Sequence, residues 1–242
     1  MLSNTIVSIK ELRPADVDVM FRLMSTYYDN VKRETFEKDL NAKKGVLLVF
    51  DDRTDLCGFT TYDVFDVHYK NEPVHVLYSG DTVIKEEYWG QMETSKMFMS
   101  LIQKCWQEYG GTTYWFLITK GIRTYRLLPL YFRVYYPTYQ FDTPRYEKEL
   151  IDYLAEYKFG HHYKKDQGII RFANEGDCLK NEYSQIAQNK LRNPHIRFFC
   201  DANPGHIMGD YLPCIAQISL DNLTDRALKF IGHPAGNKVY GA

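Results

Sequence analysis

The sequence predicts an α/β protein, in which helices flank a mixed central β-sheet and a further α/β segment follows toward the C-terminus. Two observations support this fold class. Short runs of β-branched and aromatic residues alternate with segments whose apolar residues recur at helical spacing. In addition, a helical pattern at about residues 94–109 joins two strand patterns, as in a parallel crossover, whereas the earlier strands follow one another through short turns, as in an antiparallel meander.

The first half of the chain predicts the order strand, helix, helix, three strands, helix, strand, helix. Pro14 stands where the first residue of a helix is favoured, and apolar residues at positions 17, 20, 21 and 24 then form one stripe. The predicted strands are residues 6–12, 46–50, 56–67, 74–84 and 112–118, and the later helices carry residues 36–40, 94–109 and 122–136. Gly80 interrupts the fourth strand, and a glycine inside a strand pattern often marks a β-bulge.

The chain after Pro144 predicts a second unit. Residues 146–157 and 181–191 have helical patterns, and residues 168–172, 195–200 and 212–220 have strand patterns. We therefore predict two domains, residues 1–143 and residues 144–242, with the second packing on the first.

The composition argues against several functional classes. The net charge of −1, without a dense Lys/Arg run, argues against nucleic-acid binding. No segment approaches the roughly 20 apolar residues of a membrane span, and no signal peptide is apparent at the N-terminus. No two of the five cysteines have CxxC spacing, so we expect reduced thiols, no bound metal and a cytoplasmic protein.

Three segments resemble motifs of a known family and occur in that family's order. Residues 9–16, IKELRPAD, lead from a strand into a helix whose start is marked by Pro and Asp. Leu56-Cys57-Gly58-Phe59 has the hydrophobic-Gly-aromatic pattern of a family strand, and residues 84–91 connect the next strand to a helix. Over about residues 5–140 the chain resembles the GNAT (GCN5-related N-acetyltransferase) superfamily. The resemblance implies a GNAT-like mixed sheet and an enzyme that transfers an acyl group from a thioester to an amine.

The resemblance also implies a site for the acyl donor. In the family, a loop before a helix binds the CoA pyrophosphate, because the first N–H groups of a helix are free and glycines let phosphate approach the backbone. The matching residues here are Ile84, Trp89, Gly90, Gln91, Met92, Glu93 and Thr94. Trp89 stands where the family usually has Arg, and Met92 and Thr94 stand at two small positions. The implied donor is acyl-CoA or, given these departures, an acyl-carrier protein.

Two residues are candidates for proton transfer under this resemblance. Asp81 follows the expected bulge, where the family places the thioester carbonyl, and could act as a base or bind a cationic acceptor. Its alternative role is to cap backbone N–H groups of the bulge. Leu130-Tyr131 resembles the family's leucine-tyrosine pair, so Tyr131 is the candidate acid for the leaving thiolate. Tyr125 and Tyr135 compete with it, and a purely structural core position is the alternative.

Three further residues could contact substrates. Lys120 and Arg123 follow a strand at the end where open α/β sheets bind ligands, so they could hold a phosphate or an acidic acceptor group. They could equally begin a solvated helix. His206 lies in a loop rich in turn formers and could be a general base or a bystander.

The sequence thus predicts an N-acyltransferase, an enzyme of EC class 2.3.1, with an amine acceptor. The 20 tyrosines and 14 phenylalanines suit an apolar tunnel for a fatty acyl chain. The acceptor could be a small amine or the Lys or ornithine side chain of a peptide, as in natural-product pathways, by analogy alone. Residues 144–242 could cover the acceptor side or the acyl chain. A non-catalytic GNAT-like binding module is the main alternative, and an oligomeric structural subunit is a third; the oligomeric state stays open.

Overall fold

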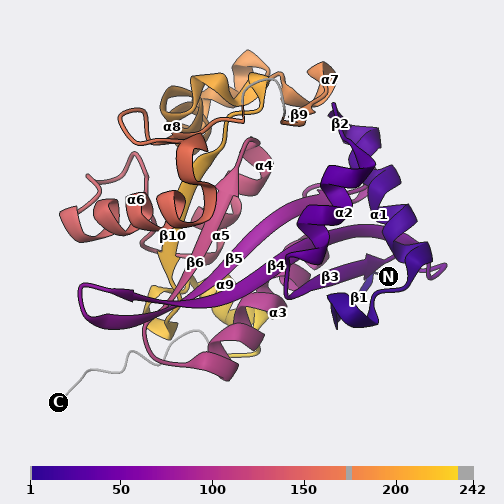
Figure 1. The fold of residues 1–242 in the computed structure, drawn as a ribbon, viewed down its shortest axis with the longest axis horizontal. Helices are drawn as coiled ribbons and strands as arrows, with labels where there is room; N and C mark the ends of the chain where they lie inside the picture. The colour runs from indigo at the N-terminus through magenta and orange to yellow at the C-terminus, as the bar shows by residue number, and fades with distance from the viewer. Residues whose placement is uncertain (1, 173–175, 234–242) are drawn as a thin grey trace.

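A computed structural model describes residues 2–172 and 176–233, and its centre is a six-stranded mixed sheet (Figure 1). The strands follow the spatial order β1-β3-β4-β5-β6-β10. All neighbours are antiparallel except β5 and β6, which run parallel because α3 connects them as a crossover. The predicted mixed sheet flanked by helices is confirmed.

The N-terminal half forms most of the sheet. Its elements are β1 (Ser3–Ser8), α1 (Pro14–Tyr27), β2 (Tyr28–Asp29), α2 (Arg33–Asn41), β3 (Gly45–Phe50), β4 (Leu56–Tyr69), β5 (Glu72–Ile84), α3 (Met92–Tyr109), β6 (Thr113–Thr119), α4 (Ile122–Tyr125) and α5 (Leu127–Tyr131). The predicted helix at residues 122–136 was wrong in its extent, because α4 and α5 are short and the chain leaves helical geometry at Phe132, whose backbone is extended.

The C-terminal half contributes β10 to the same sheet. Its elements are α6 (Arg145–Phe159), β7 (Tyr163–Lys164), β8 (Ile169–Ile170), β9 (Cys178–Leu179), α7 (Asn181–Ser184), α8 (Pro194–Ala202), β10 (Leu212–Gln217) and α9 (Asp225–Phe230). β10 pairs antiparallel with β6, from Leu212 opposite Thr119 to Gln217 opposite Tyr114. β9 pairs with β2, and this pair connects the C-terminal half to the end of α1.

One strand prediction in this half was wrong. Residues 195–200 belong to α8 rather than to a strand. Pro194 is the first residue of the helix, and the Asn193 side chain accepts hydrogen bonds from the backbone N–H groups of His195 and Ile196. This cap and the proline favour a helix start more strongly than the alternating apolar pattern favours a strand.

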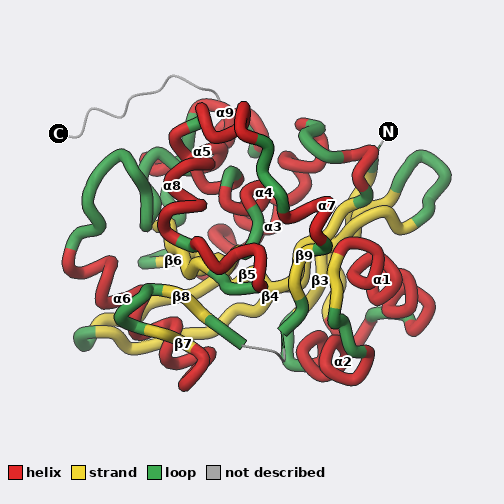
Figure 2. Tube along the Cα trace, turned by 90° about the horizontal axis from the view of Figure 1, so that it is seen from above, coloured by secondary structure: helices red, strands yellow, loops and turns green. Residues whose placement is uncertain are grey.

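Helices cover both faces of the sheet (Figure 2). On one face, α3, α5 and α9 pack against a core that includes Leu77, Trp115 and Leu117. On the other face, α6 packs over alternate residues of the same strands, such as Val76 and Phe116, and α1 and α2 cover β3 and β4. Among the described residues, no helix is both long and apolar enough to span a membrane.

The predicted irregularity of β5 is a β-bulge. Thr60 pairs with Thr82 and Tyr62 pairs with Ser79, so Gly80 and Asp81 lie together opposite one residue of β4. On its other edge, β5 pairs with β6 only as far as Ser79. The two parallel strands therefore separate at the bulge, on the carboxyl side of both.

Candidate functional site

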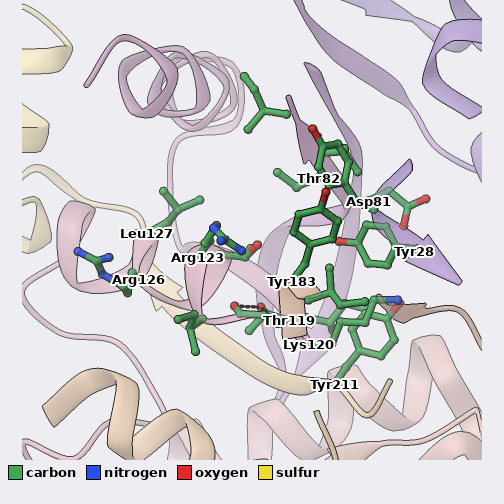
Figure 3. A pocket seen from close by; sticks show the side chains of 18 of the residues that line it. Tyr28, Asp81, Thr82, Thr119, Lys120, Arg123, Arg126, Leu127, Tyr183 and Tyr211 are labelled. Carbon is green, nitrogen blue, oxygen red and sulfur yellow. Dashed lines mark hydrogen bonds between the residues drawn. The ribbon is translucent and has the colours of Figure 1, made fainter. Parts of the chain in front are cut away.

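A cavity of about 870 Å³ opens where β5 and β6 separate. It is lined by both halves of the chain. The N-terminal half contributes the end of α1, β5, the start of α3, α4 and α5. The C-terminal half contributes residues such as Phe172, Asp177 and Tyr211. Figure 3 shows side chains of both halves around it, among them Asp81 and Thr82 from β5, Arg123 from α4, and Tyr211 from the C-terminal half. A cavity at the carboxyl ends of separating parallel strands is the usual ligand position in an open α/β sheet.

Backbone N–H groups of β5 face this cavity. The N–H of Lys85 donates to the carbonyl oxygen of Cys57 on β4 at 2.9 Å. Because successive N–H groups of a strand point to opposite edges, those of Thr82 and Ile84 point to the edge that β6 has left. They can donate to the oxygen of a ligand carbonyl lying between the strands.

The N-terminus of α3 adds further donors. No described residue accepts a hydrogen bond from the backbone N–H of Met92, Glu93 or Thr94. Met92 and Thr94 line the cavity, together with Gly90 and Gln91, whereas Glu93 is not a lining residue. Gly90 has φ of 76°, a left-handed conformation that favours glycine. The carboxylate-bearing residue Glu93 is therefore not part of the cavity wall.

Trp89 forms part of the cavity wall and does not close the cavity. Its indole N–H donates to the carbonyl oxygen of Ile84 at 2.8 Å, and the Arg123 guanidinium lies 3.6 Å from the centre of its ring. The rings of Tyr27 and Tyr183 pack against it at 5.6 and 5.5 Å. Ile84, Trp89 and Arg123 all line the cavity, so the structure brings most of the predicted donor residues together.

Asp81 carries the unpaired carboxylate of the cavity. It is partly exposed to the cavity, and no described residue forms an ion pair or a side-chain hydrogen bond with it. Burial, and then repulsion by Asp39 and Asp177, raise its pKa to about 7, against the attraction of Lys43 and Lys120. Such a carboxyl group can accept and release a proton near neutral pH.

Two Asp–Lys pairs flank this carboxylate. Lys43 contacts Asp39 at 2.5 Å, and Lys120 contacts Asp177 at 2.5 Å. Both lysine side chains are buried, with 3% and 6% of their surfaces exposed. The sequence analysis did not find Asp39 or Asp177, because both are ordinary charged residues far from Asp81 along the chain.

The ammonium group of Lys120 is surrounded by side chains that already bind it, so it is not free to bind phosphate. Its ammonium group also donates to the Tyr211 hydroxyl at 2.7 Å and lies 4.6 and 4.5 Å from the ring centres of Tyr28 and Tyr211 (Figure 3). Asp177 supplies the countercharge, so the predicted phosphate-binding role does not fit this position.

Of the other two proton-transfer candidates, the structure places His206 in the wall of the cavity and Tyr131 outside it. Tyr131 is fully buried and its hydroxyl donates to the backbone carbonyl of Ser95 at 2.6 Å, and it is not a lining residue. His206 lines the cavity from the C-terminal half and packs against Phe199, with ring centres 5.4 Å apart. Burial lowers the pKa of His206 from its ordinary value of 6.5.

Comparisons with known proteins give similarity to solved structures only. No protein-family model and no curated protein sequence matches this chain. The chain is similar to a GNAT family N-acetyltransferase from Escherichia coli in complex with CoA, at 17% identity and a TM-score of 0.36. The match covers 50% of this chain and 64% of the Escherichia coli protein, which is less than two thirds of that protein's length. It is also similar to an acyl-CoA N-acyltransferase from Pseudomonas aeruginosa, at 13% identity and a TM-score of 0.38, over 50% of this chain and 80% of that one. Glucosamine-6-phosphate N-acetyltransferase from Arabidopsis thaliana matches at 12% identity and a TM-score of 0.35, over 48% and 81% of the two chains. GNAT structures are thus among the matches, as the sequence resemblance predicted.

Proposed function

We propose that this protein is an N-acyltransferase that moves an acyl group from a thioester to a primary amine. One observation carries the proposal. The N–H groups of Thr82 and Ile84, which can polarise a carbonyl, and the unpaired carboxylate of Asp81, which can take a proton, face the same gap between β5 and β6.

The chemistry follows from this arrangement. The thioester lies in the gap with its carbonyl oxygen accepting from the β5 amides. The ammonium form of the acceptor first releases one proton to solvent. The neutral amine nitrogen then attacks the carbonyl carbon, Asp81 accepts the second proton that the nitrogen loses, and the carbon–sulfur bond breaks. Fixed N–H donors stabilise the negative charge that develops on the oxygen, a contribution worth about 3 kcal/mol per donor in acyl-transfer enzymes.

Phosphopantetheine thioesters are the donors that suit this cavity. The free N–H groups at the start of α3 favour an anion. Exposed cations also line the cavity, namely Lys32, Arg123, Arg126, Lys190 and Arg226. They suit the phosphates of CoA or the acidic surface of an acyl-carrier protein. Apolar lining residues, including Phe36, Phe98 and Leu127, support a fatty acyl chain, since each buried CH₂ contributes about 0.8 kcal/mol.

A cationic primary amine suits the acceptor side. Asp81 lies between two Asp–Lys pairs as a third carboxylate without its own lysine, so an alkylammonium group can complete the charge balance there. The Lys or ornithine side chain of a peptide has this chemistry, as does a small diamine. All five cysteines are free thiols, which supports a cytoplasmic location for the enzyme.

The test combines binding and turnover. The protein is mixed with CoA, acetyl-CoA, octanoyl-CoA, palmitoyl-CoA or an acylated carrier protein, and its thermal unfolding is followed. A bound donor at 100 times its Kd stabilises by about 2.7 kcal/mol. Each stabilising donor is then incubated with cadaverine and with Nα-acetyl-lysine amide, and the amide product is measured by mass spectrometry.

The Asp81→Asn variant is the matched control. We expect it to bind the donor and to form no amide. Donor binding by the wild type without amide formation from any tested amine would favour the non-catalytic binding module instead. Absence of both binding and turnover with every donor would overturn the proposal.

A further inference from the structure

A second, much smaller cavity lies directly behind the point where β5 and β6 separate. Its volume is about 20 Å³, and it lies on the α3 face of the sheet, against Phe98, Leu101 and Ile102. Its lining includes four residues that carry hydroxyl groups, Thr60, Ser79, Thr82 and Thr124, as well as Trp115, whose indole N–H already donates to Ser79. A cavity of this size holds one water when two to four polar partners surround it, and these hydroxyls meet that condition.

Thr82 connects the small cavity to the large one. It lines both, as do Thr124, Phe98 and Leu127. The Oγ1 atoms of Thr60 and Thr82 lie 2.7 Å apart. When Thr60 donates to Thr82, the hydroxyl hydrogen of Thr82 is left for a partner in the gap between the strands, and its other described acceptor is the carbonyl oxygen of Gly80, at the long distance of 3.5 Å.

The hydroxyl of Ser79 is oriented from the other side. The indole N–H of Trp115 donates to Ser79 Oγ at 2.7 Å, which leaves the Ser79 hydrogen for a partner inside the small cavity. A chain of donors therefore runs from the buried core through one water position toward Thr60 and Thr82. Hydrogen bonds in such a chain polarise one another in a surrounding of low dielectric constant.

The side chains of Thr82 and Asp81 lie on opposite faces of the sheet. The side chain of Thr82 lies on the face that carries α3, whereas that of Asp81 lies near Lys120 and Asp177 on the other face. A donor anchored at the start of α3 reaches the gap on the face of Thr82, and an amine held by Asp81 reaches it from the opposite face. The sulfur of the thioester then lies on the face of the Thr82 hydroxyl.

We propose that Thr82 is a catalytic residue whose hydroxyl donates a hydrogen bond to the sulfur as the carbon–sulfur bond breaks. This inference rests on the proposed acyl transfer. The new carbon–nitrogen bond forms, the electron pair of the carbon–sulfur bond moves to sulfur, and the amine proton moves to Asp81. The sulfur leaves as a thiolate stabilised by the Thr82 hydroxyl and takes a proton from solvent, since an ordinary thiol has a pKa of about 8.5.

The experiment compares leaving groups. Release of thiol is measured for the wild type and for Thr82→Val and Thr82→Ser, with acetyl-CoA, octanoyl-CoA or palmitoyl-CoA as donor and cadaverine as acceptor. A hydrogen bond to a charged group corresponds to about a 10- to 100-fold loss of kcat in Thr82→Val. Thr82→Ser should retain most of the activity. With aryl thioesters of the same acyl groups, whose thiolates need less stabilisation, the loss in Thr82→Val should shrink to a few-fold.

Thr61→Val is the matched control, because it removes a buried hydroxyl from the adjacent position of β4, and no described residue bonds to that hydroxyl. We expect wild-type kcat from it. An equal loss in Thr82→Val for alkyl and aryl thioesters, or no loss with either, would overturn the role of Thr82. Thr60→Val is a second test of the same hydroxyl pair, for use if Thr82→Val does not fold. It should lower kcat several-fold with alkyl thioesters only. A wild type that forms no amide at all would instead refute the proposed function.

Discussion

Replacing Asp81 by asparagine should remove acyl transfer and, at the same time, stabilise the folded protein at neutral and alkaline pH. The side chains have nearly the same size, so the change removes a charge and little else. Both effects have one cause, which is that the carboxylate is held in a cavity beside two other carboxylates and without a partner. A catalytic group kept in an unfavourable state costs the protein stability.

The magnitude follows from the pKa of Asp81, which burial and the neighbouring Asp39 and Asp177 raise from 3.8 to about 7. Below about pH 4 the group is protonated in both folded and unfolded states and contributes nothing. Between about pH 4 and pH 7 the unfolded chain releases the proton first, so the stability of the wild type falls as the pH rises. At about 1.36 kcal/mol per pH unit the full cost above pH 7 is at most about 4 kcal/mol, and water in the cavity reduces it to about 2 to 4 kcal/mol.

The assay is urea unfolding of both proteins from pH 4 to pH 8.5. We expect the two free energies of unfolding to differ by only about 0.6 kcal/mol at pH 4, where the unfolded carboxyl is just past half ionised, and the Asp81→Asn variant to be more stable by about 2 to 4 kcal/mol at pH 8. The kcat/KM of the wild type should rise with pH through about 7, as Asp81 ionises. Parallel stability curves for the two proteins, differing by less than about 0.5 kcal/mol at pH 8, would refute this account of the carboxylate.

Three further substitutions test neighbouring parts of the site. Lys120→Met should lower the free energy of unfolding by about 2 to 4 kcal/mol, because it leaves Asp177 without a cation, and adding Asp177→Asn should restore much of the loss in urea unfolding. Gly80→Ala should cost about 1 to 3 kcal/mol and most of the activity, since a Cβ there would lie 2.5 Å from Thr61 Oγ1; an unchanged melting temperature would contradict it. Tyr131→Phe should cost about 1 kcal/mol for its lost hydrogen bond while kcat stays within about two-fold. A tenfold fall in kcat with unchanged donor binding would instead make Tyr131 the acid.

The bulge and the crossover could be predicted because their causes are local. Gly80 marks the bulge, since a larger residue would collide with Thr61 on the neighbouring strand. The helical stripe between two β-branched runs predicts the α3 crossover, which determines that β5 and β6 are parallel. From these two features the position of the gap follows, and with it the position of Asp81.

The error at residues 195–200 and the missed partners of Asp81 have different causes. The signal for α8 was present in the sequence, as Asn193-Pro194 is a helix start, but the alternating pattern was given more weight. By contrast, no local signal pairs Lys120 with Asp177, 57 residues away, or with Tyr211, 91 residues away. Such contacts depend on how β9 and β10 fold back, which a single sequence does not reveal.

These long-range contacts allow a test of the predicted division into two domains at residue 143, because cutting the chain there would remove them. A chain that ends there would lose Asp177 and Tyr211, which pair with and cover the ammonium group of Lys120, and it would lose β10, so β6 would become an exposed edge strand. An apolar edge strand promotes aggregation. We therefore expect residues 1–143 alone to aggregate. Adding Lys120→Met should restore little solubility, because the edge of β6 stays uncovered. A soluble, cooperatively unfolding fragment would show that the N-terminal half closes its own core and that the C-terminal half serves the site alone.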